Sequence, residues 1–400
     1  MKVAVLGYGT VGSGVVQVLL EHEHSIRRKT EESVQVKYIL NRKPLPAALA
    51  DRLADFSTIE SDPEVDVVVE TMGGTGAALD YTRRALAAGK HVVTSNKEMV
   101  AAYGYEMNRL AAEHGVCYLF EASVGGGIPI IRPLSQCLAA NKILEIRGIL
   151  NGTTNYILTR MIRAGLSFGE ALAEAQEKGY AERDPSADVL GFDACRKICI
   201  LADLAFGRNV DPDLVPTEGI TCVTLEDVAY AASAGRRIKL LGRALRREDG
   251  RICVLVAPHL VDDGDPLAGV EDVFNAITVR GDATGEVMFY GRGAGKLPTA
   301  SAVCADVLDI AAHGGRRRAL SWEQGDAGML CPADELCCHW YVRAREEERV
   351  LLSALEGAQL LQGGGTAGVS ACLTGTALTR PQLDAALAGL ECLSVFRVLD

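Results

Sequence analysis

The most concentrated chemistry in the sequence lies between Gly179 and Lys197, in the stretch GYAERDPSADVLGFDACRK. Its acidic side chains fall within twelve positions and are Glu182, Asp184, Asp188 and Asp193. On a helix, Asp193 and Lys197 would share one face because they lie four residues apart. Several carboxylates could hold a substrate ammonium group, and an adjacent lysine could transfer a proton. The stretch therefore predicts a candidate catalytic site.

The main alternative is an exposed ion pair between Asp193 and Lys197, which would contribute little to stability. We expect the helix that carries the pair to begin near Val189. Its face would continue into Ile200, Leu201 and Leu204, which predicts that the pair is partly buried. Burial shifts pKa values and favours a functional site over a surface ion pair.

A glycine-rich turn near the N-terminus predicts a nucleotide site. The sequence GYGTVG, with Gly7, Gly9 and Gly12, directly follows an apolar segment at residues 2–6 and opens a segment with helical apolar spacing. Between a strand and a helix, glycines let the backbone approach a pyrophosphate, and the helix N-terminus stabilises its charge. We expect dinucleotide binding here, with a purely structural turn as the alternative.

The end of the second predicted strand lacks the acidic residue that would bind a ribose 2′-hydroxyl. Asn41, Arg42 and Lys43 occupy that place in the stretch LNRKP. Cations there favour a 2′-phosphate, so NADP is the expected cofactor and NAD the alternative. The competing interpretation is a basic turn exposed to solvent.

Two further segments follow the ends of predicted strands. Lys97, in TSNKEMVA, lies at the sheet edge where open α/β sheets bind ligands, although an ordinary surface lysine is the alternative. Glu121 begins the segment that continues as ASVGGGIPII. Its three glycines could form a hinge between domains or a turn whose carbonyl oxygens hold a cation. The residues alone leave both choices open.

These side chains need a scaffold, and the apolar pattern predicts one with three parts. Over residues 1–128, short apolar segments alternate with helical ones, which predicts a parallel sheet covered by helices, the Rossmann arrangement. Residues 129–315 predict a second, α+β domain. Its longer helices are expected over residues 157–179 and 191–207. Residues 336–400 predict a small α+β module.

Composition disfavours several classes of function. A formal net charge of -11 and a pI near 5.3 argue against nucleic acid or an anionic membrane as the partner. No stretch approaches the ~20 apolar residues of a membrane span. The cysteines form no C-x-x-C pair and no metal-type spacing to histidine, and we expect Cys195 and Cys199 to be buried small residues. A reducing, cytoplasmic location is therefore expected.

Taken together, these stretches resemble the homoserine dehydrogenase family. Residues 175–197 are similar to its signature, A-x(3)-G-Y-A-E-x-D-P-x(2)-D-V-x-G-x-D-x(3)-K. Similar segments occur in the same order: SNKEMVA, EASVGGGIPII, GILNGTTNYIL, AGVEDVFNAI and YGRGAG. The likeness covers residues 1–315, and it implies that residues 129–315 form a catalytic and dimerisation domain whose last helix, near 300–313, packs back on the first domain. It implies an enzyme that oxidises L-homoserine to L-aspartate 4-semialdehyde with NAD(P), and that physiologically runs as the reduction, in threonine, isoleucine and methionine biosynthesis.

The resemblance also implies roles for individual residues. Lys197 would donate a proton to the carbonyl oxygen, and Lys97 would be a second essential lysine close to the substrate and the nicotinamide. The implied substrate site comprises Glu182, Asp193, Thr153, Tyr180 and Asp188. The expected cofactor site comprises Gly7, Gly9, Thr10, Val11, Gly12, Arg42, Lys43, Met72, Gly73, Ser95, Lys97, Gly179 and Gly293. Main-chain carbonyls are expected to bind Na⁺ or K⁺ at Glu121, Val124, Gly126 and Ile128.

The C-terminal module resembles a degenerate ACT domain. Where that family's ligand-binding turn reads like D-R-P-G-V-L, this chain has EEERVLL, which lacks the proline and the glycine. Without the glycine, a close approach of backbone to ligand is not expected. Threonine feedback and a mere role in assembly are the two interpretations.

Three expectations concern the whole chain. Because the first strand begins at residue 2, no aspartokinase-like block is expected before it, and the chain is expected to be monofunctional. A homodimer is expected, with a tetramer as the alternative. The competing functions are another Rossmann amino-acid dehydrogenase and a non-catalytic nucleotide-binding sensor.

Overall fold

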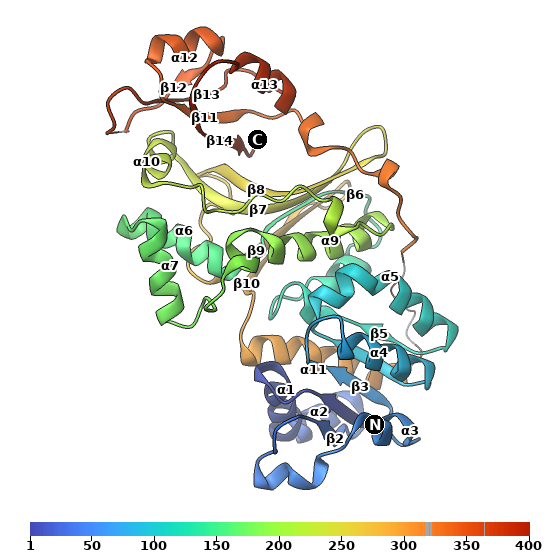
Figure 1. Ribbon diagram of the computed structural model, residues 1–400. Helices are drawn as coiled ribbons and strands as arrows, with labels where there is room; N and C mark the ends of the chain where they lie inside the picture. Colours follow the sequence, from blue (N-terminus) through green and yellow to red (C-terminus); the bar gives the residue numbers. More distant parts are fainter. Residues whose placement is uncertain (315, 317–319, 321, 364) are drawn as a thin grey trace. The chain divides into compact units, whose positions relative to one another are not determined.

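The computed structural model describes residues 1–314, 316, 320, 322–363 and 365–400 (Figure 1). The chain forms two compact units. The first unit comprises residues 1–142, 199–212 and 291–326. The second unit comprises residues 143–198, 213–290 and 327–400. The boundaries of these units differ from those of the three expected domains, and the division into three domains stays a prediction.

The first unit contains the predicted parallel sheet. Its strands are β1 (Lys2–Leu6), β2 (Gln35–Leu40), β3 (Val67–Glu70), β4 (His91–Thr94) and β5 (Tyr118–Leu119). They are all parallel and lie in the order β2-β1-β3-β4-β5. The strand order reverses at β1, and ligands bind at such switch points, outside the carboxyl ends of the strands. The Rossmann prediction is therefore confirmed.

Helices cover this sheet (Figure 1). They are α1 (Thr10–Glu21), α2 (Glu23–Thr30), α3 (Phe56–Ser61), α4 (Ala77–Ala87), α5 (Lys97–Glu113) and α11 (Lys296–Ala312). Helix α11 packs against α1 although almost 300 residues separate them. A Cβ atom on Gly14 would lie 2.9 Å from the carbonyl oxygen of Lys296, so the two helices approach too closely for any larger residue.

The second unit is built on a nine-stranded sheet in the order β10-β9-β6-β7-β8-β14-β11-β13-β12. Its central strands are β6 (Ile143–Ile149), β7 (Arg236–Arg246), β8 (Ile252–Asp262), β9 (Phe274–Gly281) and β10 (Gly285–Arg292). Strand β7 pairs with β8 and with β6, and β6 pairs with β9, all antiparallel. Ten of the eleven residues of β8 are buried, so both faces of this strand are covered.

Helices of the second unit differ from the expected ones at two places. They are α6 (Gly152–Ala164), α7 (Phe168–Glu177), α8 (Ser186–Val189), α10 (Leu225–Ser233) and α9 (Phe192–Phe206), whose residues from Cys199 onward belong to the first unit. The helix expected to begin near Val189 begins at Phe192, because Gly191 adopts a left-handed φ of 88° that interrupts it. The helix expected over residues 157–179 is two helices, which Gly165 separates with a φ of 65°.

The C-terminal segment runs β11 (Trp340–Ala344), α12 (Glu348–Ala354), β12 (Gln359–Leu360), β13 (Ser370–Leu373), α13 (Arg380–Ala386) and β14 (Cys392–Val398). This is a βαββαβ succession, and its four strands form one end of the nine-stranded sheet. Its own core includes Trp340, Val342, Leu351 and Leu383. Strand β14 pairs in parallel with β8, so the segment continues the sheet of the second unit.

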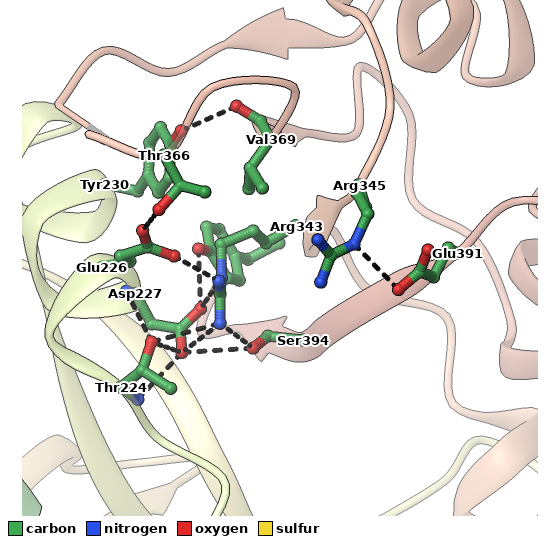
Figure 2. Close-up of polar contacts among 11 residues, drawn as sticks. Thr224, Glu226, Asp227, Tyr230, Arg343, Arg345, Thr366, Val369, Glu391 and Ser394 are labelled. Carbon is green, nitrogen blue, oxygen red and sulfur yellow. Dashed lines mark hydrogen bonds and ion pairs between the residues drawn. The ribbon is translucent and has the colours of Figure 1, made fainter.

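A cluster of buried polar side chains also joins the C-terminal segment to α10 (Figure 2). This Arg343 cluster consists of Thr224, Asp227, Tyr341, Arg343 and Ser394. The Arg343 guanidinium donates from Nε to Oδ1 of Asp227 at 2.7 Å and from Nη2 to Oδ2 at 3.3 Å. Asp227 is fully buried and also accepts from the hydroxyls of Tyr341, Thr224 and Ser394. The charges of Asp227 and Arg343 are therefore matched inside the protein.

In the described part of the chain, no helix has both the length and the apolar character needed to cross a membrane.

Candidate active site

The predicted pair of Asp193 and Lys197 is buried. Asp193 lies in the first turn of α9, and Lys197 follows one turn later. Their exposed fractions are 2% and 7%, and Nζ of Lys197 lies 2.8 Å from Oδ2 of Asp193. The alternative of a solvent-exposed ion pair is therefore wrong, and the predicted burial is confirmed. Nζ also donates to the carbonyl oxygen of Leu150, at 2.8 Å.

Asn151 connects this pair to another acidic residue of the opening stretch. Its side-chain nitrogen donates to Oδ2 of Asp193 at 2.9 Å and to Oδ1 of Asp188 at 2.7 Å. Asn151, Asp188, Asp193 and Lys197 are called the Lys197 cluster below. The sequence interpretation missed Asn151, although an asparagine between an apolar strand and a helix is a recognisable cap signal.

Two more predicted substrate residues meet beside this cluster. The hydroxyl of Thr153, in the first turn of α6, donates to the carbonyl oxygen of Tyr180 at 2.7 Å. The ring of Tyr180 is 43% exposed and lies edge-on to the ring of Tyr156, with 5.0 Å between the centroids. Gly179 provides the left-handed turn, with a φ of 73°, that leads from α7 into this loop.

Glu182 lies on the same loop with an exposed side chain. Its carbonyl oxygen accepts a hydrogen bond from Nε2 of Gln176, at 3.0 Å. The backbone of the loop is thereby tied to α7 while the carboxylate faces solvent. The structure thus brings Asp188, Asp193 and Lys197 into one cluster and joins Thr153 to Tyr180, but it gives Glu182 only a backbone attachment.

A surface network holds Tyr156 and thereby supports Tyr180. The Tyr156 hydroxyl donates to Oε1 of Glu174 and accepts from Nζ of Lys178, both at 2.9 Å. Lys178, Arg160 and Tyr156 together lower the pKa of Glu174 to about 2. This carboxylate is therefore ionised throughout the neutral range, so the network that supports Tyr156 persists there.

In the first unit, the glycine turn between β1 and α1 has two positions that only glycine can occupy and one that faces open space. Gly7 has a φ of 97°, and a Cβ atom on Gly12 would lie 1.9 Å from the carbonyl oxygen of Gly7. Both positions are therefore restricted by the fold itself. A Cβ atom on Gly9 would meet nothing within 4 Å, so this position has open space in front of it. Thr10 and Val11 begin α1 directly behind it.

The basic turn after β2 lies next to the glycine turn. The backbone N–H of Gly7 donates to the carbonyl oxygen of Leu40 at 2.8 Å, and that of Tyr8 donates to Oδ1 of Asn41 at 3.4 Å. Asn41 in turn donates to the carbonyl oxygen of Lys43 at 2.9 Å. Arg42 and Lys43 are both exposed, so their cationic side chains are accessible at this end of the sheet.

Glu70 organises the carboxyl ends of β3 and β4, and the sequence interpretation missed it. Its carboxylate is buried and accepts from the backbone N–H groups of Met72 and Gly73, at 2.6 and 3.1 Å. It also accepts from the hydroxyl of Thr94, at 2.6 Å. Burial raises the pKa of Glu70, and these hydrogen bonds oppose the rise. An acidic residue at the end of the apolar strand VVVE was the available signal.

Lys97 occupies the predicted place beyond the end of β4. It is the first residue of α5, half-buried, and follows Ser95 and the cap residue Asn96. Oδ1 of Asn96 accepts from the N–H of Met99 at 3.1 Å, and its side-chain nitrogen donates to the carbonyl oxygen of Gly74 at 2.7 Å. The helix start that carries Lys97 is therefore fixed to the turn after β3.

The three glycines after Glu121 are explained by close packing in the first unit. A Cβ atom on Gly125 would lie 2.3 Å from the carbonyl oxygen of Ile128, and one on Gly126 would lie 2.3 Å from that of Gly293. A Cβ atom on Gly127 would lie 2.7 Å from Cβ of Pro298. Close contact is thus a reason for glycine at each position: with the turn itself at Gly125, with the segment before α11 at Gly126 and with the first turn of α11 at Gly127.

The carboxylate of Glu121 is fully occupied by backbone groups. It is buried and accepts from the N–H groups of Ile130, Ile131 and Arg132, at 2.7 to 2.9 Å. Among the described residues, no group of three or more His, Cys, Asp or Glu side chains could hold a metal ion. A cation at this turn would therefore depend on main-chain oxygens, and the expected ligands Glu121, Val124, Gly126 and Ile128 stay a prediction.

Comparison with known protein families gives two adjoining matches. The model described as "Homoserine dehydrogenase, NAD binding domain" matches residues 7–121, and the model described as "Homoserine dehydrogenase" matches residues 129–308. The second match contains the whole Lys197 cluster, and the first contains the glycine turn and Lys97.

Individual relatives agree with these models. The chain is 48% identical over 318 residues to a homoserine dehydrogenase of Synechocystis sp., which covers 78% of this chain and 73% of the relative. A solved homoserine dehydrogenase from Thiobacillus denitrificans matches with a TM-score of 0.91 at 35% identity, covering 100% of this chain and 98% of that one. A hyperthermophilic archaeal homoserine dehydrogenase in complex with NADPH matches with a TM-score of 0.65 at 27% identity, covering 77% and 96%.

The first unit therefore holds a nucleotide-binding domain, and the second unit holds a buried lysine and carboxylate cluster. The chain is 48% identical to a curated homoserine dehydrogenase over more than two thirds of that relative. It also has the same fold as a homoserine dehydrogenase of known structure over its full length. The chain is an oxidoreductase that acts on a CH–OH group, and it belongs to the homoserine dehydrogenase family.

Proposed function

We propose that Lys197 is the proton donor when this homoserine dehydrogenase reduces L-aspartate 4-semialdehyde to L-homoserine. The observation that carries the proposal is the burial of Lys197, which is 7% exposed, together with the hydrogen bond from its ammonium group to Asp193 at 2.8 Å. An ammonium group with little exposure to water interacts strongly with a developing negative charge. As the carbonyl oxygen becomes an alkoxide, Lys197 stabilises it and delivers the proton.

The acidic residues of the same unit are proposed to bind the substrate. Asp188 and Asp193 are already grouped around Asn151, and Glu182 presents an exposed carboxylate on the adjoining loop. Such acceptors are suited to the α-ammonium group of the amino-acid substrate. Thr153 and Tyr180 complete the proposed site. Lys97 is proposed as a second lysine that is essential for turnover.

The cofactor is proposed to be NADP, with NAD as the alternative. The open space in front of Gly9 and the N-terminus of α1 fit a pyrophosphate, and the exposed Arg42 and Lys43 fit a 2′-phosphate. The other proposed contacts are Gly7, Thr10, Val11, Gly12, Met72, Gly73, Ser95, Lys97, Gly179 and Gly293. When bound, the nicotinamide supplies the hydride for reduction and accepts it in oxidation. NADPH in the archaeal structure supports this choice.

Further features of the enzyme are also proposed. Na⁺ or K⁺ would bind main-chain oxygens of the segment 121–128. The βαββαβ succession of residues 336–400 supports an ACT-like module, and its EEERVLL turn argues that the module serves assembly more than threonine binding. We also propose that the protein is a homodimer and that it is located in the cytoplasm. Light scattering of the purified protein can measure the size of the oligomer.

The proposed chemistry can be tested with purified protein, L-homoserine and NADP⁺. The absorbance of reduced nicotinamide should rise, and Lys197→Ala should abolish the rise while cofactor binding, measured by fluorescence, stays intact. Lys37→Ala is the control because Lys37 pairs with Asp62 and Glu64 on the surface of the first unit. No turnover with NADP⁺ or NAD⁺, or full turnover by Lys197→Ala, would contradict the proposal.

A further inference from the structure

Asn151 occupies a position from which it contacts both carboxylates of the Lys197 cluster. It is 5% exposed and stands between the end of β6 and the start of α6. Its oxygen accepts from the backbone N–H of Thr154 at 2.8 Å and from the Thr154 hydroxyl at 3.0 Å. These donors fix the orientation of the amide, because a flipped amide would turn its oxygen toward Asp188 and Asp193.

Capping of α6 alone does not explain the hydrogen bonds that the side-chain nitrogen of Asn151 makes. Asn96 caps α5 in the same way, with its oxygen accepting from Met99 and its nitrogen donating to the backbone carbonyl of Gly74. The nitrogen of Asn151 instead donates to two ionisable side chains, at 2.7 and 2.9 Å. A cap needs only the oxygen. The nitrogen of Asn151 therefore performs a second task.

That task follows from charge. Two carboxylates that approach one small group repel each other, and an amide supplies two N–H donors without adding a charge of its own. We propose that Asn151 is a positioning residue of the active site: its amide fixes Asp188 and Asp193 relative to each other and, through Asp193, fixes the direction in which Lys197 presents its ammonium group. The proposal rests on the proposed role of Lys197 and extends it.

The contact of Asn151 with Asp193 also affects how readily Lys197 gives up its proton. Asn151 and Lys197 both donate to the same oxygen, Oδ2 of Asp193. A carboxylate that accepts a second hydrogen bond has part of its charge neutralised and attracts the neighbouring ammonium proton less strongly. Without the amide donor, Lys197 should hold its proton more tightly and should also be less well aligned.

Two substitutions separate positioning from capping. Asn151→Ser keeps an oxygen at the cap and removes both N–H donors, and Asn151→Asp keeps the shape and places a third carboxylate in the cluster. In the reduction of L-aspartate 4-semialdehyde, we expect kcat to fall about 10- to 100-fold for Asn151→Ser, because misalignment by as little as 1 Å can reduce a rate to that extent. The alkaline limb of the pH–rate profile should move to higher pH, further for Asn151→Asp than for Asn151→Ser.

Ser167→Ala provides the matched control. Ser167 caps α7 in the same unit and accepts from the N–H of Glu170, so its loss weakens a helix start but alters no residue of the Lys197 cluster. We expect a lower melting temperature with an unchanged pH–rate profile. Melting curves of all variants show whether they are folded, and Asn151→Ser remains available if Asn151→Asp does not fold.

The two proposals can fail separately. An alkaline limb that stays in place in both folded Asn151 variants overturns the positioning role, whether or not kcat falls, because a purely structural asparagine would lower the melting temperature alone. An alkaline limb that persists unchanged in Lys197→Arg overturns the proton-donor role of Lys197 instead. A shift of the limb in the Asn151 variants together with its loss in Lys197→Arg supports both proposals.

Discussion

The second unit contains two buried clusters that share one arrangement but differ in their cation. In each, an aspartate in the first turn of a helix is paired with a cation: Asp193 of α9 with Lys197, and Asp227 of α10 with Arg343. The lysine comes from four residues away on the same helix. The arginine comes from β11, in the C-terminal segment, and contacts both carboxylate oxygens of Asp227.

The difference lies in what each cation can do. A guanidinium does not lose its proton in a protein, and its planar fork fits a carboxylate at two points. It is therefore suited to a permanent connection between two segments (Figure 2). A lysine ammonium binds its carboxylate at one point and can give up a proton. A buried aspartate thus supports a structural connection in one cluster and, in the role proposed for Lys197, proton transfer in the other.

Exchanging the cation of the Lys197 cluster should produce the largest effect. Lys197→Arg keeps the positive charge beside Asp193 but removes a transferable proton, so we expect kcat for homoserine oxidation to fall by about 10²–10⁴-fold. Steady-state kinetics measure the loss, and Arg343→Lys is the counterpart that should retain kcat. Equal activity in Lys197→Arg and wild type would show that the two cations are interchangeable.

Removing the cation of the Arg343 cluster should cost stability instead of activity. Arg343→Met leaves the buried carboxylate of Asp227 without its ion pair, and we expect the free energy of unfolding to fall by about 3–5 kcal/mol. Urea denaturation followed by circular dichroism measures the change. The double variant with Asp227→Asn should recover part of the loss. A loss below about 1 kcal/mol in Arg343→Met would place this pair among weak surface ion pairs.

A third buried cation sharpens the comparison because its hydrogen-bond partners are not acids. Lys239 on β7 is 1% exposed and donates to Oδ1 of Asn155 and to the carbonyl oxygen of Val270. Burial lowers its pKa from 10.5 to about 8. Between these two values the unfolded chain binds more protons than the folded one, so this group makes the protein more stable as pH rises from 8 to 10.5.

The slope from Lys239 should reach about 1.4 kcal/mol per pH unit at most. Lys239→Met removes the titrating group, so the difference in unfolding free energy between wild type and variant should change across this pH range. Denaturant titrations at several pH values measure it. A constant difference from pH 8 to 10.5 would contradict the lowered pKa of Lys239.

The smallest effect is expected from removing one of the hydrogen bonds that the carboxylate of Asp227 accepts. Tyr341→Phe removes one donor to Oδ1 of Asp227 but keeps the ring, which stacks on Phe396 with 5.7 Å between centroids. Arg343 continues to bind the carboxylate, so we expect a loss of only about 0.5–1.5 kcal/mol in unfolding free energy. Ser394→Ala removes a different donor and serves as the comparison. A cost as large as that of Arg343→Met would show that the hydroxyl and not the guanidinium stabilises Asp227.

The two clusters also differ in how far the sequence predicted them. Asp193 and Lys197 are four residues apart, and the apolar face beyond them correctly indicated burial. Nothing local connects Asp227 on α10 with Arg343 on β11, which are 116 residues apart and meet where β11, β14 and β8 lie side by side in one sheet. Contacts of this kind depend on the pairing of distant strands, which sequence periodicity does not specify.

Local errors had local causes. The helix of Lys197 was expected to begin near Val189, but the left-handed Gly191 delays it to Phe192. The parallel sheet of the first unit followed directly from the alternation of strands and helices. Asn151 and Glu70 each carried a local signal, but their side-chain partners Asp188, Asp193 and Thr94 lie 24 to 42 residues away and could not be assigned from the sequence.

The claim that Lys197 supplies the proton is tested most directly by the pH dependence of kcat/KM for the reduction of L-aspartate 4-semialdehyde. The wild-type rate should fall at alkaline pH as the donor loses its proton. Lys197→Arg should show a much lower rate without this alkaline limb, since an arginine stays protonated. The same alkaline limb in both proteins would assign the titration to another group and contradict the account.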